Sequence, residues 1–166
     1  MAVFKGHKLL ECDVRRYTRS ILEGIHKCDY DHCDLNPDNI LLVPTTTTSS
    51  GGTSFVAKIV DFGLAKKTKE NYSQWRSTPS CIVFEMLNGK SPYDLKPGYN
   101  PNNLHDMLMF DHLRTCKIPT RISDVARGFP KSCLAMKFRE RLTAERLLSH
   151  PFVARPQPYK RGSYQG

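Results

Sequence analysis

The sequence lacks any apolar run of about eighteen residues, the length that a membrane-spanning helix needs. Its first ten residues, MAVFKGHKLL, carry Lys5, His7 and Lys8 too early for the apolar core of a signal peptide. The six cysteines form no C-x-x-C pair and no regular spacing, which argues against a zinc site and a disulfide framework. We therefore expect an intracellular protein, cytoplasmic or nuclear, with reduced thiols and no membrane contact.

The chain also lacks a concentrated block of one charge, although 25 Lys and Arg against 16 Asp and Glu give it a net charge of +9. The basic residues are spread from Lys5 to Arg161. Neither the interleaved aromatic and basic residues of an RNA-binding sheet nor a helix-turn-helix pattern accompanies them. A solvated basic surface is the preferred interpretation, and specific nucleic-acid binding is not expected.

What the sequence does contain suits one globular domain. Hydrophobic residues make up 39% and charged residues 25% of its 166 residues, close to the values of folded proteins. A chain of this length buries about two thirds of the surface that it exposes when unfolded. One hydrophobic core is therefore expected.

The apolar residues fall into segments with the periods of helices and strands. Val14, Tyr17 and Ile21 recur at helical spacing and predict a helix over 13–26, with Asp13 as its N-cap. Two short apolar runs predict a hairpin with a long Thr, Ser and Gly tip. The predicted strands are 40–43 and 55–60, and further helices are predicted at 81–87, 104–113, 124–138, with a kink or early end at Pro130, and 144–149, capped by Thr143.

Two motifs carry specific chemistry. The segment HCDLNPDN at 32–39 and the tripeptide DFG at 61–63 resemble the catalytic loop and the metal-binding motif of protein kinases, and Asp34 and Asn39 have the family's H-R-D-x-x-x-x-N spacing. CIVFEMLNGKSPY resembles the end of the central helix of the kinase C-lobe, and RLTAERLLSHPF resembles its closing helix. DVRRYTRSILEGIH, the H-C-D variant and DFGLAK are similar to kinases of the MAP-kinase-kinase-kinase type.

The resemblance implies a role for each matching residue. Asp34 would accept or orient the proton of the substrate hydroxyl, and Asn39 and Asp61 would hold Mg²⁺ beside the phosphates of ATP. Phe62 and Gly63 would complete the cofactor-binding segment, with Phe62 setting the state of the loop. ATP and Mg²⁺ are the implied cofactors, and a protein substrate or a kinase-cascade partner is the implied partner.

The sequence departs from the family's pattern at several positions. Asn36, which we keep with Asp34 as a catalytic position, stands where the family has a lysine, and Cys33 replaces the arginine of H-R-D. Asp31 stands where the family has an apolar residue, so its burial without a partner would be costly. No glycine-rich loop and no assignable ATP-binding lysine precede His32.

A further block is missing after residue 79, where the family has its peptide-docking stretch and A-P-E motif. Arg141 would thereby lose the glutamate that pairs with it in the family. Upstream of this junction, a solvated loop is preferred over phosphorylation for the hydroxyl residues Thr68, Ser73, Ser77 and Thr78.

The expected fold is therefore α+β and mainly α, a kinase-like C-lobe with a small β-hairpin and no N-terminal lobe. Residues 1–153 would form the partial kinase domain, internally deleted after residue 79, and 154–166 a basic flexible tail. The expected function is serine/threonine kinase-type phosphoryl transfer, inactive or very weak in this chain alone. The alternatives are a pseudokinase interaction module and a truncated product without a selected function.

Overall fold

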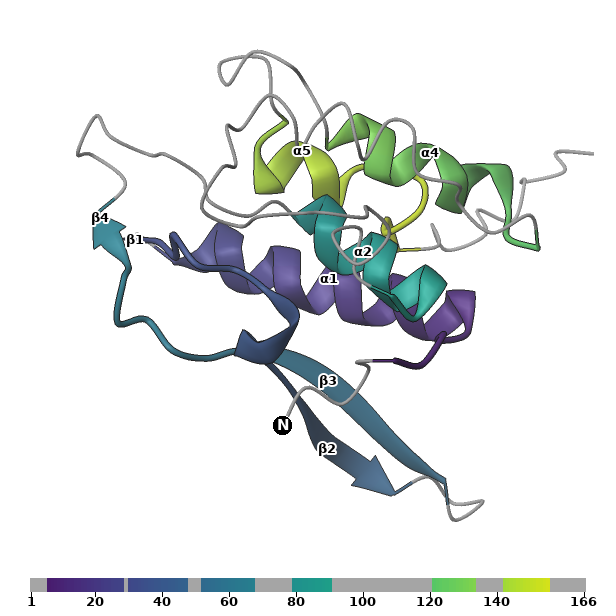
Figure 1. Cartoon of the computed structure of the whole chain (residues 1–166), viewed down its shortest axis with the longest axis horizontal. Helices are drawn as coiled ribbons and strands as arrows, with labels where there is room; N and C mark the ends of the chain where they lie inside the picture. The colour runs from purple at the N-terminus through teal and green to yellow at the C-terminus, as the bar shows by residue number, and fades with distance from the viewer. Residues whose placement is uncertain are drawn as a thin grey trace, which may run out of the picture.

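The computed structural model describes residues 6–28, 30–47, 52–67, 79–90, 121–133 and 142–155. The described helices pack together, and the β2–β3 hairpin projects from the side opposite to α4 and α5 (Figure 1). The fold is α+β and mainly α, as expected. Its elements, in chain order, are α1 (Glu11–Lys27), β1 (Tyr30–Asp31), the 3-10 turn η1 (Pro37–Asn39), β2 (Ile40–Thr47), β3 (Thr53–Ile59), β4 (Lys66–Lys67), α2 (Pro79–Asn88), α4 (Asp124–Ser132) and α5 (Ala144–Leu148).

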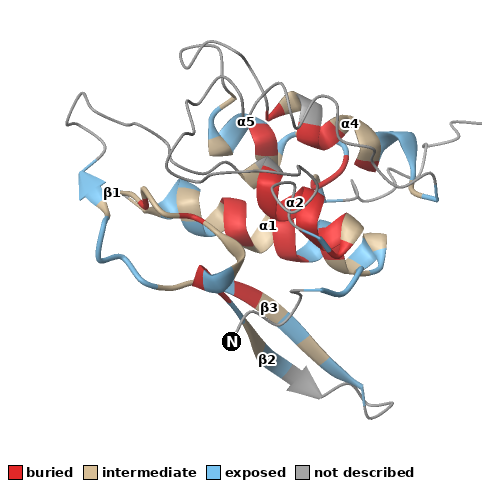
Figure 2. Ribbon diagram, in the orientation of Figure 1, coloured by how far each residue is buried: buried red, intermediate tan, exposed pale blue. Residues whose placement is uncertain are grey.

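Helix α1 lies at the centre of the core because one of its faces is apolar at helical period. Val14, Ile21 and Leu22 are almost fully buried on this face. α2, α5 and β3 all contact α1, and Figure 2 shows buried residues on α1 and on α2, which lies against it. The predicted helix is thus confirmed, and it organises the packing of the rest.

The predicted N-cap of this helix was wrong. The helix begins at Glu11, and its N-cap is Leu10, which makes no side-chain cap bond. Asp13 lies inside the first turn and forms an ion pair with Arg16 at 2.7 Å. An acidic side chain in the first turn favours the helix through its dipole without capping it, so Asp13 supports the helix in a different way from the one expected.

Helix α2 is buried on every side, which is typical of a short helix that is apolar all round. Every residue from Cys81 to Leu87 is buried. The helix ends where the Asn88-Gly89 pair predicted, because Gly89 adopts a φ of +72° and donates its N–H to the Glu85 carbonyl at 2.7 Å. Glycine adopts this left-handed conformation without steric cost.

The hairpin is confirmed, but its strands are longer than predicted. β2 and β3 pair antiparallel from Ile40 opposite Ile59 to Thr47 opposite Thr53. A register shift between Pro44 and Thr46 accommodates the proline, which has no N–H for the ladder. No strand was predicted at β4, which consists of two lysines and pairs antiparallel with β1.

Two helices complete the described core. α4 contains Pro130 and ends at Ser132, within the longer helix that was predicted. Thr143 caps α5 as predicted, because its side chain accepts the Arg146 N–H at 3.3 Å. No helix among the described residues is long and apolar enough to cross a membrane. The predicted helix at 104–113, the hydroxyl residues at 68–78 for which a solvated loop is expected, Arg141 and the tail beyond 155 lie outside the described residues.

His150 makes the stability of this core depend on pH. Its Nδ1 accepts the backbone N–H of Phe152 at 3.1 Å, and burial lowers the pKa of the imidazole. Since protonation would place a hydrogen on Nδ1, it would remove the acceptor of this bond. The unfolded chain therefore takes up a proton more readily than the folded chain, and this contribution to stability is present above the unfolded pKa of about 6.5 and is lost as the pH falls through the folded pKa.

We expect the urea midpoint to fall between pH 7.5 and pH 5, and the variant His150→Asn to show a flatter dependence. Asparagine keeps an acceptor for the N–H two residues on, and it does not titrate. Urea unfolding followed by circular dichroism at both pH values measures the effect. Equal pH dependence in the parent chain and the variant would contradict the role of His150.

Candidate functional site

His32 fastens the 32–39 loop to the segment that contains Asp61. The ring is buried, and its Nε2 lies 2.9 Å from the carbonyl oxygen of Val60. Its Nδ1 lies 3.4 Å from the Asp34 backbone nitrogen. A neutral imidazole with its proton on Nε2 donates to Val60 and accepts from Asp34, so a single tautomer satisfies both contacts.

Asp34 and Asn39 meet directly in this loop. The Asn39 side-chain Nδ2 donates to the Asp34 backbone oxygen at 2.8 Å and to its carboxylate Oδ2 at 3.2 Å. Asn39 is itself buried, and its carbonyl accepts the Val60 N–H at 3.0 Å. The spacing of the motif therefore brings together two of the predicted site residues and ties both to the strand that leads to Asp61.

Asn36 uses both ends of its side chain inside the loop. Its Oδ1 accepts the Asp38 N–H at 2.9 Å, which caps the η1 turn. Its Nδ2 donates to the Asp34 carbonyl at 3.1 Å. The side chain thus holds the shape of the loop, and it carries no charge to offer to a phosphate.

The Asp61-Phe62-Gly63 segment follows β3. Asp61 has a φ of +63° and an exposed carboxylate whose Oδ1 accepts the Gly63 N–H at 3.2 Å. A non-glycine residue in this conformation is sterically strained, which is common at functional sites. The Phe62 ring meets the His32 ring edge to face, with centroids 4.9 Å apart, while 46% of Phe62 remains exposed.

Cys33 and Asp31 contact each other at the N-terminal end of the 32–39 loop. Cys33 also has a positive φ, +62°, and its thiol donates to the Asp31 carbonyl at 3.3 Å. The Asp31 residue is partly buried opposite Lys66 in the β1–β4 pair. Burial raises the pKa of its carboxyl, which is the direction expected when a carboxylate stands at a position suited to an apolar residue.

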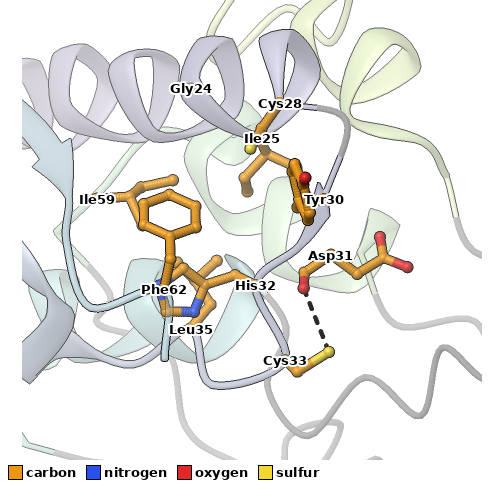
Figure 3. A pocket seen from close by; sticks show the side chains of 10 residues that line it. All are labelled: Gly24, Ile25, Cys28, Tyr30, Asp31, His32, Cys33, Leu35, Ile59 and Phe62. Carbon is orange, nitrogen blue, oxygen red and sulfur yellow. Dashed lines mark hydrogen bonds between the residues drawn. The ribbon is translucent and has the colours of Figure 1, made fainter. Parts of the chain in front are cut away.

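A small, mainly apolar pocket lies beside His32 and Phe62. Figure 3 shows the side chains of Phe62 and Ile59 close together on one side of it, with the Cys33–Asp31 bond at its rim. An apolar hollow of this kind suits a hydrophobic group and has no cluster of cations for phosphates. Its lining residues are Gly24, Ile25, Cys28, Tyr30, Asp31, His32, Cys33, Leu35, Ile59 and Phe62.

No protein-family model matches the sequence. Among solved structures, the chain is similar to the Rad53 kinase domain with SCD2 in complex with AMPPNP, with a TM-score of 0.62 and 28% identity over 92% of this chain and 63% of that chain. Mitogen-activated protein kinase kinase kinase 20 of Arabidopsis thaliana is 31% identical over 89% of this chain and 49% of its own length. The chain is thus similar in sequence and in fold to serine/threonine protein kinases.

Other relatives of the chain are also serine/threonine kinases. Mitogen-activated protein kinase kinase kinase 1 of Arabidopsis thaliana is 30% identical over 95% of this chain and 28% of its own length. Serine/threonine-protein kinase 17A of Oryctolagus cuniculus is 32% identical over 86% of this chain and 41% of its own length. The chain thus spans less than half the length of each of these curated relatives.

The side-chain oxygen atoms of the 32–39 loop and of Asp61 are suited to Mg²⁺, which prefers carboxylate and carbonyl ligands. No group of three or more His, Cys, Asp or Glu that could hold a metal ion occurs in the described part of the chain. Asp34, Asn39 and Asp61 are the oxygen donors that the two motifs supply. This donor set fits Mg²⁺ held by one or two protein ligands together with the phosphates of a nucleotide, which is the usual arrangement for this ion.

Val60 is the residue of the site that sequence reasoning missed. It acts through its backbone, which accepts from His32 at 2.9 Å and donates to Asn39 at 3.0 Å. Because any residue other than proline offers the same backbone groups, the letter at this position carries no signal. Its place directly before the DFG motif was the only available clue.

Proposed function

We propose that the chain is part of a kinase domain that transfers the γ-phosphoryl group of ATP to a serine or threonine hydroxyl of a protein, and that it does so weakly or not at all on its own. The observation that supports this proposal is the double attachment of Val60, through which His32 and Asn39 fix the Asp34 loop to the residue before Asp61. Phosphoryl transfer depends mainly on such positioning of carboxylates, metal and phosphates.

Each polar group of the site has a proposed task. The carboxylate of Asp34, oriented by the Asn39 amide at 3.2 Å, would accept or orient the proton of the substrate hydroxyl. The side-chain oxygen of Asn39 and the exposed carboxylate of Asp61 would hold Mg²⁺, which neutralises charge on the phosphates when it is bound. A protein of a kinase cascade is the proposed class of substrate or partner, by analogy with the relatives.

The weak activity is proposed on the basis of Asn36. Its two side-chain polar atoms are occupied by Asp38 and Asp34, and it cannot supply the cation that the family places there. Losing one preorganised transition-state contact costs about 2.7–4 kcal/mol, or roughly a hundredfold to a thousandfold in rate. This observation also favours the second candidate, a pseudokinase module that binds a cascade partner without turnover.

Calorimetry of Mg²⁺-dependent ATP binding tests the proposal. We expect Asp61→Asn to weaken the affinity about tenfold or more, because it removes a charged oxygen ligand. Asparagine tolerates the left-handed φ of Asp61, so the fold should survive. Asp124→Asn is the matched control, since it removes the same charge from a fully exposed position on α4.

The outcomes separate the two candidates. Saturable binding that is weakened by Asp61→Asn and unchanged by Asp124→Asn would support nucleotide-dependent phosphoryl transfer. A folded parent chain that does not bind ATP in the presence of Mg²⁺ would contradict phosphoryl transfer. The pseudokinase module would then be the remaining candidate. Equal weakening in both variants would mean that the nucleotide senses only the overall charge of the chain.

A further inference from the structure

A pair of residues far apart in the sequence joins the first turn of α1 to the start of α4. The Glu11 carboxylate accepts the Ser123 hydroxyl on Oε1 at 2.6 Å and the Ser123 backbone N–H on Oε2 at 2.8 Å. The Ser123 Oγ also accepts the Ala126 N–H at 3.1 Å, which caps α4. We refer to these contacts as the Glu11–Ser123 clasp.

The clasp depends on a negative charge on one side and a hydrogen-bond donor on the other. Burial acts to raise the pKa of Glu11, but the two bonds from Ser123 and the nearby Arg15 outweigh it, so that the pKa lies below its usual value. The carboxylate is therefore ionised at neutral pH, and both of its bonds from Ser123 are charge-assisted. Removing the hydroxyl proton of Ser123 and adding negative charge there would reverse the interaction.

We propose that Ser123 is a regulatory phosphorylation site, and that its modification opens the clasp and releases the start of α4 from α1. In this reaction a separate protein kinase transfers the γ-phosphoryl group of ATP. The bond between the γ-phosphorus and the bridging oxygen breaks, a bond from phosphorus to Ser123 Oγ forms, the hydroxyl proton passes to the base of that kinase, and ADP leaves. The proposal does not depend on catalysis by the present chain.

Ser123 is accessible to such an enzyme. It lies at the exposed surface just before α4, and Arg121, two residues earlier, is exposed as well. Basic residues beside a serine favour its recognition by kinases that select cationic segments through charge complementarity. By contrast, the hydroxyl of Thr18 is buried in the core and closed to modification.

The local charges decide what the phosphate would do. A phosphoserine carries about −1.5 to −2 charges at neutral pH and would face the Glu11 carboxylate, which now binds the same oxygen at 2.6 Å. Arg15 lies 3.9 Å from that carboxylate and pairs with Glu11, while Arg127 lies 3.9 Å from the neighbouring Asp124 carboxylate. The dipole of α4 favours a negative group at its start, but this effect is weak at an exposed position and is screened by salt. Repulsion therefore dominates.

The release would be local, because α4 has a second attachment to the core. Ala126, Phe129 and Cys133 remain buried among the core residues. The part that would open is thus the turn at Ser123, whose Oγ holds the Ala126 N–H, while the side chains of α4 stay packed. Local opening of this kind is measured by the exchange of backbone amides.

The test compares the full chain carrying phosphoserine at position 123 with the unmodified chain, by amide hydrogen exchange. We expect the amides of Ser123 and Ala126 to exchange about tenfold faster after modification, as when 1.4 kcal/mol of local stability is lost. Treatment with a phosphatase should restore the original rates. In the Glu11→Gln background the modification should cause no acceleration, since the glutamine amide can donate to the phosphate.

A second variant tests whether negative charge at position 123, without a phosphate group, is enough to open the clasp. Ser123→Asp keeps a good N-cap, because aspartate caps helices as well as serine does. It should accelerate exchange in the parent chain and leave the Glu11→Gln chain unchanged. Equal acceleration in both backgrounds, or none in the parent, would overturn the proposal.

The availability of the hydroxyl is tested separately. The full chain is incubated with Mg²⁺, ATP and the catalytic domain of a kinase that selects serines near arginine, and Ser123→Ala serves as the control. Label located at Ser123 and lost in Ser123→Ala would support the assignment. Label that appears only at other residues would overturn it.

Discussion

The variant Phe129→Ala is expected to lower the free energy of unfolding by about 3–5 kcal/mol, the range for removing a buried aromatic ring. The Phe129 side chain is 0% exposed. Its ring lies 5.1 Å from the His150 ring and 5.2 Å from the Phe152 ring, measured between centroids. Truncation would leave a cavity at the junction of α4 with the segment after α5, where two aromatic neighbours would lose their partner.

Urea unfolding followed by circular dichroism measures this loss, and two variants calibrate it. Phe129→Leu keeps most of the apolar volume and should cost clearly less than Phe129→Ala. Val125→Ala shortens a side chain that is 40% exposed on the same helix and should change stability by about 0.5 kcal/mol or less. If Phe129→Ala and Val125→Ala had the same urea midpoint, the packing of α4 described above would be wrong.

Replacing Gly89 by alanine is the second substitution with a large expected effect. The left-handed φ of +72° costs a side-chain-bearing residue about 1–2 kcal/mol. A Cβ at this position would also lie 2.9 Å from the Lys8 backbone nitrogen and 3.0 Å from the His7 carbonyl carbon. The Leu9 N–H donates to the Met86 carbonyl at 2.9 Å and holds this segment against α2, so relieving the overlap costs about 1–3 kcal/mol more.

Gly6→Ala separates the two components. Gly6 has a similar φ of +84°, but nothing lies within 4 Å of the Cβ that alanine would add. It should therefore show the backbone strain alone, and Gly89→Ala should be the less stable of the two by about 1–3 kcal/mol in urea unfolding. Gly128→Ala, which is also free of neighbours and lies in α4, should stabilise the chain by roughly 0.5–1 kcal/mol. Equal losses at Gly89 and Gly6 would exclude the close contact with the N-terminal segment.

The parts of the fold that follow from local patterns were predictable. The helical period around Val14 and Ile21 gave α1, and the apolar run that ends at Gly89 gave α2. β4 was missed because its two lysines have little strand propensity. Its extended form results from pairing with β1, a tertiary contact that no window of sequence contains.

In the site, too, local motifs were predictable from the sequence and tertiary contacts were not. Motif spacing was enough to expect Asp34 beside Asn39, and the hydrogen bonds between them agree with it. The spacing did not indicate that both polar atoms of the Asn36 side chain form hydrogen bonds within the loop. Nor could it link Glu11 to Ser123, which are separated by 112 positions, because a lone glutamate and a lone serine carry no pairing signal.

The β2–β3 hairpin also allows the chain to change in length at the tip of the hairpin without changing the geometry of the site. Pairing of Ile40 with Ile59 closes the excursion that begins after the 32–39 loop and returns just before Asp61. The entropy lost on closing such a loop grows only slowly with its length, by about 0.6 kcal/mol for each doubling. Insertions or deletions beyond the Thr47–Thr53 pair therefore carry a small thermodynamic cost. They leave the 32–39 loop and Asp61 in place. We therefore expect changes in chain length to be tolerated at this end of the hairpin and not at the end that meets α1.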